Sequence, residues 1–247
     1  MSKLYALTDI HGYLDILKET MKKVDLSADN KLIFLGDYID RGPASKETLE
    51  YIYHLQKQYP DQVIVLKGNH EDMFLDWLQD PSNINYLQSD VDMRTIKTFI
   101  PEDVMPYIDA LCNSHRATTV YHINATIIHH VQKNNKGLIR WLESLPVYYE
   151  TENQIFVHAG INEEAGTYWK YGTEDRYYMW KFPPTVGPFS KDIIAGHTGT
   201  YFFMNDKSFH DIYFDGQSHY YLDSTVYVSK KLNLLVYDTE TEKYIFK

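Results

Sequence analysis

The sequence holds few of the features that place a protein in a specialised class. One cysteine in 247 residues excludes an internal disulfide framework and a thiolate-based zinc site. The longest apolar runs, such as LIFL and VIVL, are too short to span a bilayer, so we expect no membrane association. The N-terminal segment MSKLYALTDIHG lacks the long apolar region of a signal peptide. These absences predict a cytoplasmic protein.

Basic residues are also scarce. The chain has 24 Lys and Arg against 34 Asp and Glu, a formal net charge of −10, and no run of Lys or Arg. This balance argues against a nucleic-acid-binding surface. Hydrophobic residues make up 44% of the chain, which is ordinary for a globular protein of a length that can bury a large core. With no repeat or linker apparent, residues 1–247 are predicted to form a single domain.

The first eighty residues alternate between short apolar runs and helical patterns. Short connections between such strands and helices predict parallel pairing with right-handed crossovers, and hence an α/β fold. Ser45 is a candidate N-cap for the second helix. Strands are expected at 4–8, 32–35 and 63–66, and helices at 13–24, 45–59 and 71–80.

The rest of the chain divides into a helical part and a strand-rich part. Residues 80–137 show scattered helical spacing, and we expect a helical insertion or lid whose first clear strand is TTVYHINATII at 118–128. The segment GLIRWLESLP, at 137–146, is typical of a helix ended by proline. Strands are then expected at 154–157, 192–195, 211–214, 224–229, 233–239 and 243–246, the last two forming a hairpin.

Five of the predicted strands end in the same way, with Asp, Asn or His beside a glycine. In open α/β sheets the ends of neighbouring strands converge on one crevice, where ligands bind. Buried together without a partner, such side chains would be costly, so their combination predicts a metal site. The six donors are Asp9 and His11 in DIHG, Asp37 in GDYIDRG, Asn69 in GNHE, His158 in HAG and His197 in GHT.

The predicted donors favour particular metals. Two carboxylates, one amide and three imidazoles without a thiolate suit Mn²⁺ best, with Fe or Zn²⁺ as alternatives. Six donors exceed the needs of one open catalytic ion but suit two divalent ions that share a carboxylate. Such a pair activates a bridging water and binds both the incoming and the leaving oxygen of a phosphoryl group.

Residues beside the donors complete a hydrolytic mechanism. His70 directly follows Asn69 and is the candidate general acid for the leaving oxygen. Asp40 is the candidate partner that fixes the tautomer of His70, and Arg41 offers a planar fork of donors to phosphoryl oxygens. The alternative is that Asp40 and Arg41 pair only with each other in a turn.

The five motifs in this order resemble the phosphoprotein phosphatase branch of the calcineurin-like metallophosphoesterases. The chain is most similar to prokaryotic and phage-type serine/threonine protein phosphatases, and the motifs span Asp9 to Thr198. The resemblance implies a four-layer αββα sandwich with a dinuclear metal centre at its strand ends. It places Asp37 on both metals, and it supports His70, Asp40 and Arg41 in the roles given above. It implies Asp9 and His11 on the first metal, and Asn69, His158 and His197 on the second.

The chain departs from the family pattern at several positions. Thr8 and Ala159 replace two glycines, and we expect both to affect packing only. A second phosphate-binding arginine is not at its usual place near Trp180, and Arg176 or Lys181 is the candidate substitute. The Asn-Gly-Gly element common after the GNHE helix is also missing. These departures leave the predicted metal ligands in place and bear instead on the identity of the substrate.

The predicted activity is hydrolysis of phosphomonoesters, on phosphoserine or phosphothreonine in proteins, with phosphotyrosine and small phosphoesters as alternative substrates. One alternative is a symmetric diadenosine tetraphosphate hydrolase, in which the aromatic segment 168–180 would stack on a second nucleotide. Another is a non-catalytic protein-binding scaffold, for which we would expect some of the metal-binding residues to be replaced. His129 and His130 are read as structural residues, His210 and His219 as surface residues, and Cys112 as a small buried residue.

Overall fold

The computed structural model describes residues 2–113 and 119–247, and its strands form two five-stranded sheets. The first sheet has the order β10 (Lys243–Phe246), β9 (Leu235–Asp238), β1 (Lys3–Leu7), β2 (Lys31–Phe34), β3 (Val63–Val65). Within it β1, β2 and β3 are parallel, while β9 pairs antiparallel with β1 and forms a hairpin with β10. The second has the order β4 (Tyr148–Glu150), β5 (Gln154–Val157), β6 (Asp192–Ala195), β8 (His219–Tyr221), β7 (Tyr213–Phe214).

Alternation along the strands places the two sheets face to face. Leu4 and Ala6 of β1 face the second sheet, whereas Tyr5 and Leu7 face the helices, because successive side chains of a strand point in opposite directions. Phe156 of β5 joins the core between the sheets from the other side. Apolar strand residues are therefore buried on both faces of each sheet.

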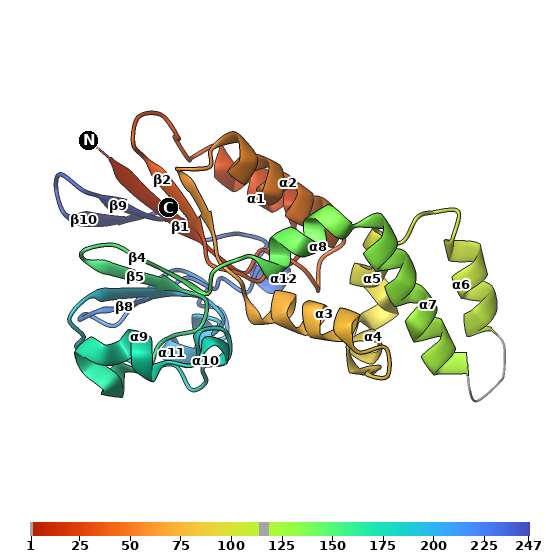
Figure 1. Ribbon diagram of the computed structural model, residues 1–247. Coiled ribbons are helices and arrows are strands. Elements are labelled where there is room, and N and C mark those ends of the chain that lie inside the picture. The colour runs from red at the N-terminus through yellow and green to blue at the C-terminus, as the bar shows by residue number, and fades with distance from the viewer. Residues whose placement is uncertain (1, 114–118) are drawn as a thin grey trace.

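Helices cover the outer faces of both sheets (Figure 1). The first sheet is covered by α1 (Leu14–Met21), α2 (Ser45–Gln58) and α8 (Lys136–Glu143). The second is covered by η2 (Glu163–Tyr168), α9 (Trp169–Gly172), α10 (Asp175–Trp180) and α11 (Tyr201–Met204). The predicted four-layer αββα fold is confirmed. No helix within the described residues is long and apolar enough to cross a membrane.

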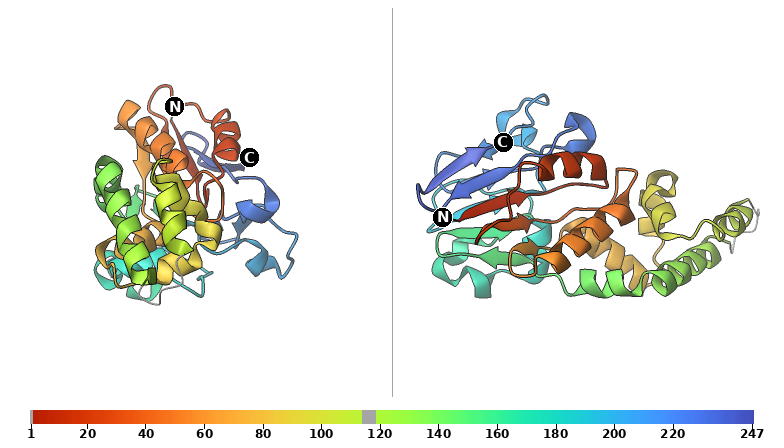
Figure 2. Two further views of the ribbon diagram at one scale, coloured as in Figure 1. Left: turned by 90° about the vertical axis from the view of Figure 1, so that its right-hand side faces the viewer. Right: turned by 90° about the horizontal axis from the view of Figure 1, so that it is seen from above.

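The segment between residues 80 and 137 is helical where it is described. It follows α3 (Asn69–Gln79) and extends away from the sheets, with the yellow-green helices farthest out (Figure 2). That this segment is a separate insertion that moves as a lid stays a prediction. Its elements are α4 (Asn85–Ser89), η1 (Val91–Met93), α5 (Arg94–Phe99), α6 (Met105–Cys112) and α7 (Thr119–Asn134).

Two strand predictions were wrong. TTVYHINATII forms most of α7 from residue 119 onward, because Ile123, Ile127 and Val131 lie on one helical face that is buried. Residues 224–229 were expected as a strand, yet Val226–Ser229 form the short helix α12. Thr225 has a left-handed backbone with φ of 54°, which no strand tolerates, and the true strand β8 precedes it.

Three smaller predictions were also wrong. Ser45 is not an N-cap but the first residue of α2, and its hydroxyl accepts a hydrogen bond from the amide of Asp40. Cys112 is exposed at the end of α6. His219 is buried in β8 and is not a surface residue, and its Nδ1 lies 3.0 Å from the carbonyl oxygen of Gly187.

Candidate metal centre and active site

The ends of five strands from both sheets bring the six predicted donors to one place. Asp9 follows β1, Asp37 follows β2 and Asn69 begins α3 just after β3, while the second sheet supplies two histidines. A cavity of about 170 Å³ is lined by five of the six. The sixth, His158, is buried directly behind Asn69. Sequence-distant residues therefore share a single buried site.

The donors form two groups that share Asp37. In the first, Nε2 of His11 lies 3.9 Å from Oδ1 of Asp9 and 3.8 Å from Oδ2 of Asp37. In the second, Oδ1 of Asn69 lies 2.9 Å from Nε2 of His158 and 2.9 Å from Nδ1 of His197. Oδ1 of Asp37 lies 3.3 Å from Nε2 of His158. The two oxygens of Asp37 thus face different groups.

Backbone carbonyls orient two of the imidazoles. Nδ1 of His11 lies 2.9 Å from the carbonyl oxygen of Ile39, and Nδ1 of His158 lies 3.0 Å from that of Leu35. A carbonyl only accepts, so each Nδ1 carries the proton and each Nε2 presents a lone pair to the site. This is the usual arrangement behind metal-ligating histidines.

The protonation states also suit cation binding. Burial lowers the pKa of His11 to about 3 and that of His197 to about 4, so both imidazoles are neutral donors. Burial, reinforced by the carboxylates of Asp223 and Asp37, raises the pKa of Asp9 well above its ordinary value. The ionised form of Asp9 is therefore disfavoured unless a cation lies beside it.

Asp9, Asp37 and Asp223 are all buried, and within the described residues none forms an ion pair with a lysine or arginine. His70, whose pKa is raised, is a cationic neighbour of Asp37, but three carboxylates buried together remain costly, and divalent cations would offset that cost. The oxygen and nitrogen donors fit such cations chemically. The donors at this site therefore fit divalent metal ions.

The backbone at the site is unusual. Asp9, His11, Asp37 and His197 all have positive φ, between 48° and 62°, a conformation that non-glycine residues rarely adopt. Gly196 is required because a Cβ there would clash with the carboxylate of Asp9. These turns aim the side chains into the cavity instead of along the strands.

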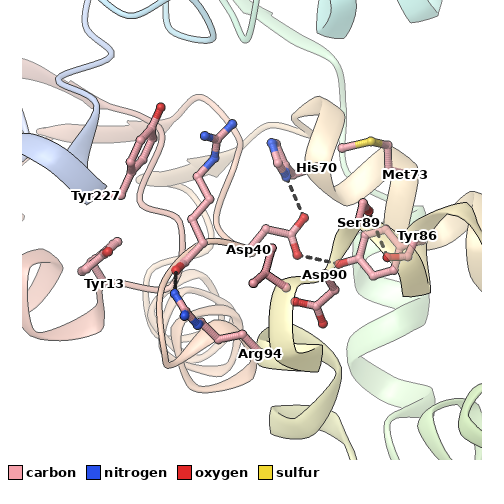
Figure 3. A pocket seen from close by; sticks show the side chains of 11 residues that line it. Tyr13, Asp40, His70, Met73, Tyr86, Ser89, Asp90, Arg94 and Tyr227 are labelled. Atoms are coloured by element: carbon pink, nitrogen blue, oxygen red, sulfur yellow. Dashed lines mark hydrogen bonds and ion pairs between the residues drawn. The ribbon is translucent and has the colours of Figure 1, made fainter.

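The predicted catalytic residues line a neighbouring cavity, and His70 and Arg41 also line the first one (Figure 3). Nδ1 of His70 lies 2.6 Å from Oδ2 of Asp40, and its Nε2 lies 3.8 Å from Oδ2 of Asp37. Burial lowers the pKa of His70, but the negative charges of Asp37 and Asp40 outweigh the effect of burial and raise this pKa to about 9. Arg41 does not pair with Asp40, and its guanidinium lies 4.6 Å from the ring centre of Tyr227.

A second cavity, of about 600 Å³, adjoins the first and shares Arg41, His70 and Tyr227 with it. Its far wall comes from α4, η1 and α5 of the helical segment. Within it, Nη1 of Arg94 donates a hydrogen bond to the carbonyl oxygen of Arg41. This cavity offers space for a group attached to a phosphoryl centre beside His70.

Sequence reasoning gave no role to Glu71, although it belongs to the GNHE motif. Its carboxylate is fully buried and accepts hydrogen bonds from four backbone N–H groups. The carboxylate oxygens of Glu71 lie 2.9 Å from the backbone nitrogen of Asp37, 2.8 Å from that of Tyr38, 3.3 Å from that of Ile39 and 3.1 Å from that of Gly68. Glu71 therefore fixes the turn that carries Asp37.

Glu71→Ala is expected to lower the free energy of unfolding by about 3 kcal/mol, because several buried N–H groups lose their acceptor. Chemical denaturation of the purified variant measures the change. The matched control is Glu164→Ala, at an exposed position, which should stay within about 0.5 kcal/mol of the parent. Equal stability of the two variants would contradict the positioning role.

The roles of two further residues were not predicted from the sequence. Thr8 was expected to affect packing only, yet its hydroxyl donates a 2.7 Å hydrogen bond to Oδ2 of Asp9. Asp223 lines the smaller cavity, and burial raises its pKa to about 6. Its position after a strand resembles that of Asp9, but no glycine stands beside it to signal the turn.

The two candidates for a second phosphate-binding residue lie elsewhere. Lys181 is 4% exposed, donates to the carbonyl oxygen of Ile161 at 2.7 Å and forms an ion pair with Glu163. The guanidinium of Arg176 lies 5.1 Å from the ring centre of Trp180. Neither residue lines the two cavities, and a role in binding substrate stays a prediction for both.

The fold and the clustered donors are those of a metal-dependent phosphoesterase. A family model described as calcineurin-like phosphoesterase matches residues 2–228, so the chain belongs to this family. Members of the family use a dinuclear divalent metal centre and act on phosphorylated substrates. The family predicted from the motifs is confirmed.

Relatives of known structure or function include several phosphatases. A stretch of 63 residues is 43% identical to the serine/threonine-protein phosphatase 6 catalytic subunit of Caenorhabditis elegans, covering 26% of this chain and 19% of that protein. The fold is similar to a cold-active protein-tyrosine phosphatase of a psychrophilic Shewanella species, with TM-score 0.59, 20% identity and coverage of 99% and 77% of the two chains. A serine/threonine phosphatase from Saccharomyces cerevisiae gives TM-score 0.55, 14% identity and coverage of 100% and 79%. These two structural likenesses show the fold alone.

Proposed function

We propose that this protein is a metal-dependent phosphomonoesterase that acts on phosphoserine or phosphothreonine in proteins. The observation that carries the proposal is the His70–Asp40 pair, which lies between the donor cluster and the larger cavity. The alignment with a serine/threonine phosphatase supports the choice of substrate. A non-catalytic scaffold is disfavoured because all six donors, His70 and Arg41 are present.

The six predicted donors are proposed to hold two divalent metal ions, Mn²⁺ first, with Fe or Zn²⁺ as alternatives. Asp37, which belongs to both groups of candidate ligands, is the proposed shared residue. When bound, the ions would supply positive charge for the phosphoryl oxygens and activate water for hydrolysis. Asp9 and His11 are assigned to one ion, and Asn69, His158 and His197 to the other.

The chain's own residues then bind the ester and move a proton. Arg41, which lines both cavities, is placed to bind phosphoryl oxygens through its planar guanidinium. Asp40 accepts a hydrogen bond from Nδ1 of His70, so the Nε2 proton faces the site. From there His70 is proposed to donate that proton to the leaving oxygen, while the leaving group occupies the larger cavity.

The alternative of a diadenosine tetraphosphate hydrolase required aromatic stacking from the segment 168–180. Tyr168 and Tyr171 are 71% and 92% exposed, and neither lines the cavities beside His70. The tyrosines that do are Tyr13, Tyr86, Tyr201 and Tyr227. The segment 168–180 thus lines neither cavity, which disfavours its stacking on a second nucleotide.

A substrate panel on metal-stripped protein, with and without added Mn²⁺, tests the proposal. The panel contains p-nitrophenyl phosphate, its bis-ester, phosphoserine and phosphotyrosine peptides, and diadenosine tetraphosphate. We expect metal-dependent turnover of the monoesters, led among the peptides by phosphoserine. Preference for the dinucleotide would indicate nucleotide hydrolysis in place of the proposed activity. Lack of turnover on every substrate would favour the non-catalytic scaffold.

A further inference from the structure

Tyr86 of α4 makes a contact with the catalytic pair that the proposed mechanism does not use. Its hydroxyl donates a 2.6 Å hydrogen bond to Oδ1 of Asp40, while Oδ2 of the same carboxylate lies 2.6 Å from Nδ1 of His70 (Figure 3). Both oxygens of Asp40 are therefore occupied from opposite sides. The three side chains form a continuous chain from the helical segment to the general acid.

The tyrosine itself is held firmly in place. Its side chain is 5% exposed and its ring stacks on Trp77 with centroids 5.1 Å apart. The ring also meets Phe74 edge-on at 5.6 Å. Burial and the Asp40 carboxylate raise the pKa of Tyr86 well above its ordinary value, so the hydroxyl keeps its proton and acts as a donor.

The helical segment reaches Asp40 by a second route. The Asp40 amide donates to the hydroxyl of Ser45, which lies 3.2 Å from the hydroxyl of Thr95 in α5. Asp40 needs such support because its own backbone is left-handed, with φ of 69°. Both the carboxylate and the backbone of Asp40 are thus connected to residues beyond the two sheets.

We propose that Tyr86 is a positioning residue that holds Asp40, and through it His70, in the orientation for proton transfer to the leaving oxygen. The helical segment is then part of the catalytic apparatus as well as a wall of the cavity. This inference rests on the proposed general-acid role of His70. It assigns Tyr86 no contact with substrate.

The dependence of turnover on the leaving group tests this role. Phenyl phosphate and p-nitrophenyl phosphate have similar shapes, but phenoxide is the poorer leaving group and needs the proton more. Tyr86→Phe should lower kcat for phenyl phosphate by about 10-fold and for p-nitrophenyl phosphate by less than about 2-fold, with KM unchanged for both. Equal losses on the two substrates, or no loss, would overturn the inference.

Two comparison variants separate positioning from packing. Trp77→Phe disturbs the same aromatic cluster without touching Asp40, so any loss of kcat should be equal on the two substrates. Tyr107→Phe, at a position 51% exposed in α6, should leave kcat unchanged. Because phenylalanine keeps the ring of Tyr86, the variant should fold, and thermal unfolding verifies this.

The same substrates distinguish failure of the inference from failure of the proposed function. His70→Asn must show the leaving-group dependence more strongly than Tyr86→Phe, otherwise the general-acid role itself is wrong. If His70→Asn shows it and Tyr86→Phe does not, only the inference about Tyr86 fails. In an Asp40→Asn background, Tyr86→Phe should have no further effect on kcat, and an independent loss there would also overturn it.

Discussion

His70→Asn is expected to lower kcat for a phosphoserine peptide by about 100- to 10,000-fold, the usual contribution of a positioned general acid. Asparagine cannot supply a proton to the leaving alkoxide, although it fills similar space at the start of α3. Because His70 is the proposed proton donor and not one of the six proposed ligands, metal content should remain near that of the parent protein. Steady-state kinetics and elemental analysis of the same sample measure both quantities.

The matched control for this variant is His129→Asn. His129 is exposed on α7 and lines neither cavity, so its loss should change kcat by no more than experimental error. Activity that survives His70→Asn with metal content intact would contradict the general-acid assignment. Loss of metal in the same variant would instead place His70 among the metal ligands. His11, Asp37 and His70 do form one group whose side chains lie close enough to hold an ion.

Asp37→Asn is expected to abolish both metal binding and turnover. Asp37 belongs to both groups of candidate ligands, so one substitution weakens two sites at once. Asparagine keeps the shape and can still accept the 3.0 Å hydrogen bond from the amide of His70, so the fold should persist. We expect turnover to fall by about 1,000-fold or more, since metal chemistry supplies several kcal/mol of the barrier reduction.

Metal content, kcat and circular dichroism of Asp37→Asn should be compared with those of Asp76→Asn. Asp76 is exposed on α3 and loses one negative charge in the same way without facing the site. Two tightly bound ions and near-normal turnover in Asp37→Asn would exclude it as the shared ligand. Loss of one ion alone would confine Asp37 to a single site.

The cluster of candidate metal donors could be predicted from the sequence because its signal is local. Each donor stands within four residues of the end of a short apolar run and within three residues of a glycine, and strand ends of this kind meet at one edge. The sequence also indicated the His70–Asp40 pair, because His70 directly follows Asn69 and Asp40 lies close after Asp37 in the chain. The structure places these donors together and puts Nδ1 of His70 at 2.6 Å from Asp40.

The parts that were missed depend on contacts between distant segments. Tyr86 lies in a segment without clear periodicity, and its bond to Asp40 spans 46 positions of the chain. Asp223 ends a strand that was misplaced, because the left-handed turn at Thr225 has no glycine to signal it. The strand expected in α7 failed because β-branched residues there follow the helical period of a buried face.

We propose that a pair of divalent ions held by the strand-end residues makes this protein a phosphomonoesterase. The most direct measurement is turnover of p-nitrophenyl phosphate during titration of the metal-stripped protein with Mn²⁺, with bound metal counted at each point. We expect no turnover without metal and full activity at about two bound ions per chain. Turnover that persists in the stripped protein, or saturates at one ion, would contradict the dinuclear account.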